Sequence, residues 1–170
     1  FCFTTEISMV TGLTPGDTYY VRVYTASNNN EQSISFDMCI LSPPSNDECV
    51  NSKPVIPNSG QVCAPVNMVK GSTLVASPSL PVLNPALTGA ACGQNRNDIW
   101  YHFVATQSSH AISLNNIKIF PDTAVESLKL NFSVFSGTCD NLTNLYCSVD
   151  NYLNVTGLTA GETYYIRVYT

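Results

Sequence analysis

Two stretches of this chain share one pattern: residues 10–25 read VTGLTPGDTYYVRVYT and residues 155–170 read VTGLTAGETYYIRVYT. Aligned back to Phe1 and Tyr146 without a gap, the two copies lie 145 positions apart and are identical at 14 of 25 positions. Repetition in register over this length is typical of a tandem array, and an offset of 145 residues is the size of one domain. The sequence therefore predicts tandem repeats of about 145 residues.

Each copy predicts a β-strand that follows a tight turn. The residues Gly-Leu-Thr-x-Gly are turn formers, and the aromatic and β-branched residues after them alternate with a period of two. Successive side chains of a strand point to opposite faces, so Tyr164, Ile166 and Val168 share one face. We expect that face to pack in a hydrophobic core.

Other segments read as strands too. Residues 98–106 (DIWYHFVAT), 110–114 and 128–135 (LKLNFSVF) are extended patterns bounded by turn residues, and no segment has a sustained helical period. Many short strands separated by turns predict an all-β fold, which we expect to be an antiparallel β-sandwich of the jelly-roll type.

The repeat offset and the prolines predict the domain organisation. Residues 1–41 should be the C-terminal part of a preceding repeat, with residues 33–40 as its final strand. Residues 42–46 contain two prolines and should form a stiff linker. Residues 47–170 should be the next repeat without its final strand, because the counterpart of residues 33–40 would fall beyond residue 170.

Composition excludes several functions. Seven Lys and Arg stand against twelve Asp and Glu, with a formal net charge of -5, so no basic patch is available for nucleic acid. No apolar run is long enough to insert into a membrane. The only two histidines are His102, within a predicted strand, and His110, at a turn. We expect each to be a structural or a surface histidine, and we predict neither an enzyme nor a cofactor.

Seven cysteines predict disulfides and an oxidising, extracellular location. Their spacings contain no Cys-x-x-Cys pair, so zinc is disfavoured. Cys139 and Cys147 flank DNLTNLY and should bond across a hairpin. The repeat logic leaves Cys2 and Cys39 without partners. One of Cys49, Cys63 and Cys92 should be left over as well, and we expect Cys63 to pair with Cys92 and Cys49 to remain unpaired.

The face opposite the predicted core offers a candidate ligand surface. Two tyrosines flanking an arginine could stack on a sugar or hold an acidic group, although the same stripe could pack against a neighbouring strand or loop. The residues are Tyr165, Arg167 and Tyr169, and in the first copy Tyr20, Arg22 and Tyr24. Of the two readings of the stripe we favour packing. Trp100 poses the same choice, and there burial is favoured more strongly because it is the only tryptophan and lies in the middle of a predicted strand.

Four motifs together carry a family resemblance: NDEC at residues 46–49, DIWYHF at 98–103, VFSGTC at 134–139 and GLTAGETYYIRV at 157–168. They resemble the jelly-roll repeat of giant surface and gliding adhesins that Bacteroidota-type bacteria export by type IX secretion. They are similar, more distantly, to the bacterial pre-peptidase C-terminal domain. The resemblance implies an extracellular, disulfide-stabilised, non-catalytic repeat of a cell-surface stalk or filament.

The expected function is therefore structural and adhesive, with gliding motility as the context that the resemblance implies. The expected partners are neighbouring repeats and surface glycans. The alternative is a carbohydrate-binding module appended to a secreted enzyme. Residues 122–124, Asp-Thr-Ala, resemble the O-glycosylation acceptor of the same bacteria, which makes Thr123 a candidate glycosylation site. We expect no metal, because each copy carries too few carboxylates after its hairpin cysteine for a calcium loop.

Overall fold

The computed structural model of the chain describes residues 10–24, 35–79, 97–119, 123–124 and 130–170. The chain divides into two compact units, Phe1–Leu41 and Ser42–Thr170. Within the described part, no helix is long and apolar enough to cross a membrane.

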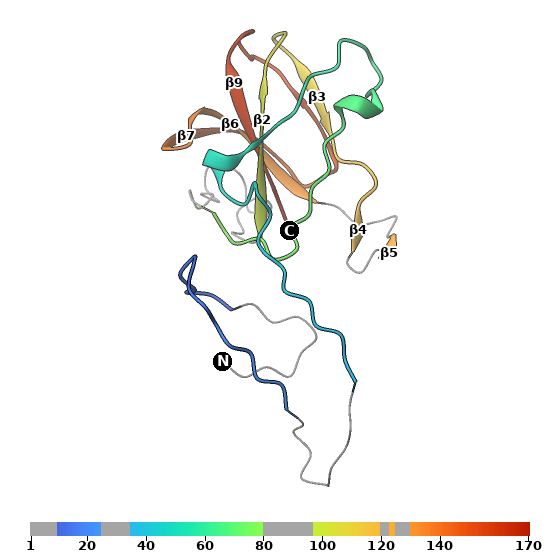
Figure 1. The fold of residues 1–170 in the computed structure, drawn as a ribbon. Helices are drawn as coiled ribbons and strands as arrows, with labels where there is room; N and C mark the ends of the chain where they lie inside the picture. The colour runs from blue at the N-terminus through green and yellow to red at the C-terminus, as the bar shows by residue number, and fades with distance from the viewer. Residues whose placement is uncertain (1–9, 25–34, 80–96, 120–122, 125–129) are drawn as a thin grey trace. The chain divides into compact units, whose positions relative to one another are not determined.

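The second unit is built on a five-stranded sheet in the order β1-β2-β9-β6-β7 (Figure 1). Its strands are β1 (Lys53–Pro54), β2 (Asp98–Val104), β9 (Thr163–Tyr169), β6 (Asn131–Thr138) and β7 (Asn141–Ser148). All neighbours are antiparallel except β1, which runs parallel to β2. The second copy of the repeated stretch thus forms the central strand, β9, as its β-branched and aromatic residues predict.

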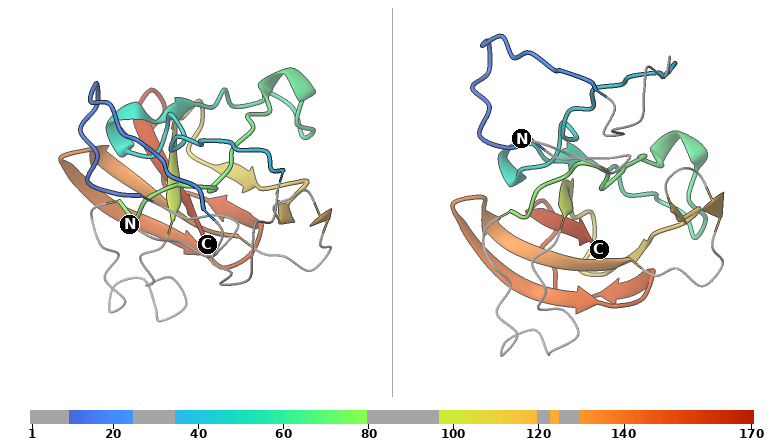
Figure 2. Two further views of the ribbon diagram at one scale, coloured as in Figure 1. Left: turned by 60° about the horizontal axis from the view of Figure 1, so that its bottom comes forward. Right: turned by 90° about the horizontal axis from the view of Figure 1, so that it is seen from below.

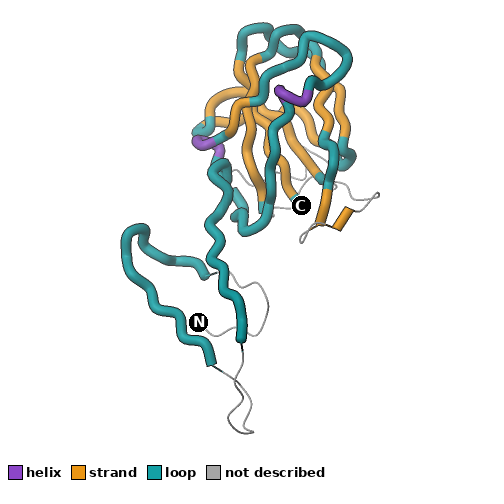
Figure 3. Tube along the Cα trace, turned by 45° about the vertical axis from the view of Figure 1, so that its right-hand side comes forward, coloured by secondary structure: helices purple, strands orange, loops and turns teal. Residues whose placement is uncertain are grey.

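Smaller elements complete the unit. β3 (His110–Ser113) pairs with β8 (Tyr152–Val155), and β4 (Lys118–Ile119) pairs with β5 (Thr123–Ala124). The helical content of the described residues is two short 3-10 turns, η1 (Cys49–Asn51) and η2 (Pro65–Asn67), as Figure 3 shows. These elements confirm an all-β fold with antiparallel sheets.

One face of the five-stranded sheet, here called the core face, packs against the β3–β8 pair. Strict alternation brings one set of side chains from β2, β6 and β9 to this face, where they are buried. Residues of the β3–β8 pair pack against that set, among them Ile112 and Leu153. The buried side chains on the core face of the sheet are Ile99, Tyr101, Phe103, Phe132, Val134, Tyr164, Ile166 and Val168.

The opposite face, here called the outer face, is also covered. The chain around η1 and residues 77–79 crosses it and buries Trp100, Phe135 and Tyr169. A central strand covered on both faces needs no polar side, which explains why six consecutive residues of β2, from Asp98 to Phe103, are mostly buried.

The β6–β7 hairpin is curved, as the two orange strands of Figure 2 show. Val134 of β6 pairs with Tyr146 of β7, and the next residue, Phe135, pairs with Asn144, so Leu145 is an extra residue in β7. Such a bulge bends a strand pair and increases its twist. Beyond the bulge, residues 136–138 of β6 pair with β7 alone, because the ladder with β9 ends at Phe135.

The first copy of the repeated stretch adopts no strand, contrary to the prediction. None of the described residues of Phe1–Leu41 is in a strand, which also contradicts a final strand over residues 35–40. Tyr20 is 93% exposed and Ile40 is 79% exposed. The physical reason is that a strand needs neighbours for its ladder, and the described residues of this unit provide none.

Candidate functional site

The candidate ligand stripe of β9 is buried, which excludes the ligand surface and agrees with the packing alternative that the sequence favoured. Arg167 and Tyr169 are each 1% exposed, and Tyr165 is half-buried. Arg167 forms an ion pair with Asp98, which is fully buried. Its guanidinium carbon lies 5.5 Å from the ring centre of Trp100 and 5.9 Å from that of Tyr169. The stripe therefore packs beneath a covering segment, the alternative favoured above.

A polar network surrounds this buried pair. Arg167 donates to the carbonyl of Ser79 at 2.9 Å. Asp98 accepts the backbone N–H of Ser79 at 3.0 Å and also its hydroxyl. The indole N–H of Trp100 donates to the Ser79 hydroxyl at 2.9 Å, and that hydroxyl lies 3.0 Å from the carbonyl of Asp47. Buried polar groups cost little when they are paired in this way, so the network stabilises the covering segment.

The same network holds the start of the domain on the sheet. Trp100 donates its backbone N–H to the carbonyl of Asn46 at 2.8 Å, and the Asn46 amide donates back to the Trp100 carbonyl at 2.8 Å. The Asp47 carboxylate accepts the backbone N–H and the hydroxyl of Ser77, both at 2.8 Å. The NDEC motif, residues 46–49, thus fixes the start of the domain to the sheet, and we call these residues the latch.

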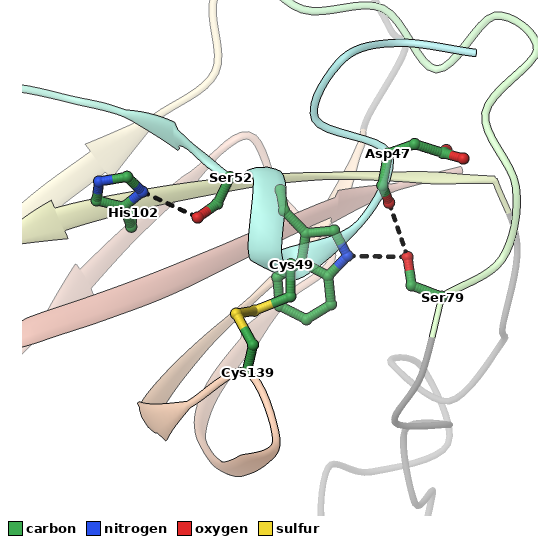
Figure 4. The surroundings of a disulfide bond; sticks show 7 residues. Asp47, Cys49, Ser52, Ser79, His102 and Cys139 are labelled. Atoms are coloured by element: carbon green, nitrogen blue, oxygen red, sulfur yellow. Dashed lines mark hydrogen bonds between the residues drawn. A yellow bond between two sulfur atoms is a disulfide. The ribbon is translucent and has the colours of Figure 1, made fainter.

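A disulfide between Cys49 and Cys139 closes this latch, with 5.6 Å between the two Cα atoms (Figure 4). It contradicts both the predicted Cys139–Cys147 bond and the expectation that Cys49 is unpaired. Cys139 lies at the hairpin tip, whereas Cys147 lies far up β7, opposite Ser133. The predicted bond required a turn within DNLTNLY, but residues 141–146 of that stretch belong to β7.

The other cysteines divide as follows. Cys147 is also disulfide-bonded. Cys63 is an exposed free thiol, so it does not pair with Cys92 as predicted. Cys39 is an exposed free thiol as well. Cys2 and Cys92 lie outside the described residues.

Both histidines contact neighbouring segments of the chain. Nδ1 of His102 lies 2.9 Å from the hydroxyl of Ser52, which ties the chain after η1 to β2 (Figure 4). Nε2 of His110 accepts the backbone N–H groups of Thr106 and Gln107 at 3.1 and 3.3 Å. Among the described residues, no carboxylate bonds to either ring, and no group of His, Cys, Asp and Glu side chains could hold a metal ion.

The remaining predicted site residues lie apart from this network. Tyr20, Arg22 and Tyr24 are exposed in the first unit, where Arg22 lies 5.8 Å from the ring centre of Tyr24. Thr123 belongs to β5. Trp100 is fully buried, as predicted.

A shallow opening at one end of the five-stranded sheet is the best candidate for ligand contact. It encloses about 420 Å³ and is lined by residues 136–138 of β6 and residues 161–164, which lead into β9. We call it the β6–β9 gap. Its lining contains three serine and threonine side chains, one tyrosine, one glutamate and two glycines, so polar side chains and open backbone lie beside an aromatic ring.

Sequence reasoning missed both the latch and the gap. One signal for the latch was present: residues 98–104 carry large apolar side chains on both faces, with Trp100 on the face of Asp98. A strand of this kind is covered on both sides. The gap had no local signal, because two segments 25 positions apart form it.

Comparison with known proteins identifies the fold family. Residues 45–170 match the family model described as galactose binding domain-like, which is associated with type IX secretion. Neither a curated protein nor a solved structure gives a match. The match begins one residue before the NDEC motif and covers the second unit except for its first three residues. The chain therefore belongs to the galactose-binding domain-like family associated with the type IX secretion system.

Proposed function

We propose that this chain is a non-catalytic module of a large cell-surface adhesin or filament, in which tandem copies form a stalk that contacts surfaces and supports gliding. The observation that carries the proposal is the use of Arg167, Asp98 and Tyr169 inside the domain. These are the side chains that a binding or acid–base face would present. Here they hold the covering segment on the sheet instead.

Two further features support an extracellular structural role. The family is associated with type IX secretion, which exports proteins to the cell surface and beyond. Disulfides such as Cys49–Cys139 persist in an oxidising environment. This bond joins the start of the domain to the tip of the β6–β7 hairpin and so resists unravelling from that end.

A second candidate is a carbohydrate-binding module attached to a secreted enzyme. The galactose-binding-like family description and the polar β6–β9 gap favour it. The two candidates differ in the specificity expected of the isolated chain: an adhesive module retains particles on surfaces, whereas an appended module binds one glycan, to which it would direct a catalytic neighbour.

Bead adhesion under flow tests the leading proposal. Microspheres that carry the folded chain should be retained on polysaccharide-coated glass, and microspheres that carry the reduced and alkylated chain should detach. Retention no better than that of albumin-coated microspheres would overturn the proposal. So would turnover of chromogenic esters, glycosides or peptides by the purified chain, because the proposed module performs no chemistry.

A further inference from the structure

We propose that residues 35–41 of one copy of this chain dock on residues 62–70 of a second copy, where Cys39 and Cys63 form a disulfide. The inference rests on the modular filament proposed above and names the contact that joins its modules. Cys39 and Cys63 are the free cysteines of the described residues, and both are exposed. Each lies in a largely exposed apolar segment that belongs to no strand.

Residues 35–41, here called the donor segment, have the pattern of a strand without its neighbours. In an extended chain, Asp37 and Cys39 share one face. The other face carries three apolar side chains that are between 61% and 79% exposed: Phe36, Met38 and Ile40. Such a face is stable only when neighbouring chains complete a ladder and cover it. The donor segment is therefore suited to dock on a surface that supplies both.

Residues 62–70, here called the acceptor segment, surround η2 and offer an apolar surface. The exposed apolar side chains are Val62, Val66, Met68 and Val69. Apolar side chains that are exposed together, rather than singly, mark an interaction surface. Residues 69–72 lie outside any strand, and an extended chain can pair with such a segment through its backbone groups. The acceptor segment thus offers both an apolar cover and a backbone partner.

The repeat register assigns the two thiols to one kind of junction. At the offset of 145 residues, the counterpart of Cys39 in the second unit would be residue 184, and the counterpart of Cys63 in the first unit would precede residue 1. Each unit of the repeat therefore has a place for one cysteine of each kind, and this chain holds one from each unit. Two copies of the chain together supply each thiol with the partner that the register assigns to it.

Charge favours the pairing of donor with acceptor over the pairing of like segments. Asp37 is exposed on the donor segment and Lys70 on the acceptor segment. Docking of donor on acceptor brings these opposite charges together, whereas two donor segments would oppose two carboxylates. A disulfide needs Cα atoms ~4.4–6.8 Å apart, which is also the spacing of neighbouring extended chains. The bond is therefore compatible with side-by-side packing of the two segments.

The bond forms by thiol–disulfide exchange with a small disulfide such as oxidised glutathione. The thiolate of Cys39 attacks one sulfur of the small disulfide, which releases one thiol and leaves a mixed disulfide. The thiolate of Cys63 then attacks the Cys39 sulfur and releases the second thiol. The two protein thiols lose two protons and two electrons, and the small disulfide is reduced to two thiols. Both protein sulfurs are exposed, so each is open to this attack.

A contact of this kind builds an open chain of modules. The donor and acceptor segments are different surfaces, so the contact is heterologous and leaves one donor and one acceptor free at the two ends of a dimer. Heterologous contacts that do not close into a ring produce filaments. The proposed junction therefore extends the filament and locks each step covalently.

Oxidation of the full 170-residue chain in a glutathione buffer tests the contact, with the products trapped by N-ethylmaleimide and separated on a non-reducing gel. The wild-type chain should form a ladder of covalent oligomers. Cys39→Ser and Cys63→Ser should each remain monomeric alone. An equal mixture of the two variants should form a dimer and nothing larger, because one supplies only Cys63 and the other only Cys39. Peptide mapping by mass spectrometry should find these two cysteines joined.

A charge exchange in the same mixture tests the docking apart from the sulfur chemistry. Asp37→Lys, added to the Cys63→Ser variant, should slow dimer formation about tenfold, because it sets a like charge against Lys70. Lys70→Asp, added to the Cys39→Ser variant, should then restore the rate. Asp17→Lys makes the same change of charge at an exposed turn of the first unit and should leave the rate unchanged.

Four results would overturn the contact: a wild-type chain that stays monomeric, a bond between Cys39 and Cys63 within one copy, bonds between two identical cysteines, or an Asp37→Lys variant that dimerises at the original rate. Bead retention separates this inference from the proposed function. Retention by a chain that forms no ladder would leave adhesion standing and remove the contact. A ladder without retention would support the contact and remove the adhesive function.

Discussion

Replacing Arg167 by methionine should destabilise the domain, because Arg167 holds the segment that covers the outer face of the sheet. The change removes the ion pair with Asp98, the bond to the Ser79 carbonyl and the contacts with two aromatic rings. Methionine is also a long side chain and fills most of the space, so the effect is electrostatic rather than a cavity. Breaking a buried ion pair from one side costs about 3–5 kcal/mol, because the other charge stays buried. That is between about a fifth and all of the stability of a typical domain, ~5–15 kcal/mol.

Arg22 provides a control for this substitution, and Trp100 provides a fluorescent probe of unfolding. Arg22 stands in the same local sequence but is exposed, so Arg22→Met should change the free energy of unfolding by less than ~0.5 kcal/mol. Urea unfolding can be followed by the fluorescence of Trp100, the sole tryptophan, which is buried beside Arg167. If Arg167→Met lowers the free energy of unfolding by less than ~1 kcal/mol, the reasoning is refuted, because a buried Asp98 carboxylate without its cation should cost more than that.

Three further perturbations follow from the same structure. Replacing Cys49 and Cys139 by serine should lower the free energy of unfolding by up to ~4.6 kcal/mol on chain-entropy grounds, given the separation of 90 residues, while Cys63→Ser changes little in the same urea titration. Burial raises the pKa of Tyr169 above its ordinary value of 10.0. Its contribution to stability is therefore present below pH 10 and is lost as the pH rises beyond it. The free energies of unfolding at pH 8 and pH 11 should differ less in Tyr169→Phe than in the wild-type chain. Gly137 has φ +99° and a Cβ there would collide with the backbone of the facing strand, so Gly137→Ala should lower the melting temperature in calorimetry, and an unchanged value would contradict this reading of the hairpin.

Local sequence determines the turn before the repeated strand but not the strand itself. Both copies form the same turn: the backbone N–H of Asp17 donates to Thr14 at 3.2 Å, and that of Glu162 donates to Thr159 at 3.2 Å. Both also place the arginine over the following tyrosine ring. Only the second copy is a strand, because only there do β2 and β6 complete the ladder. The tight turn was predictable from a few residues, whereas the strand depends on partners far along the chain.

The positions of the polar side chains could not be predicted from alternation alone. Alternation places Arg167 and Tyr169 correctly on the face opposite Val168, and the structure agrees. Whether that face meets water depends on residues 46–52 and 77–79, which cover it from far along the chain. The predicted cysteine pairing was wrong for a related reason. Closeness in sequence suggested Cys139–Cys147, whereas the partner of Cys139 is Cys49, 90 positions away.

The bond between Cys49 and Cys139 also limits how far the module can be stretched. Under tension, the backbone between two bonded cysteines cannot lengthen, and here that backbone comprises 90 steps. At ~3.6 Å per residue, roughly 320 Å of contour length is withheld even from a fully unfolded module. In a filament made of such modules, each module that unfolds under tension would therefore lengthen by a small and fixed amount.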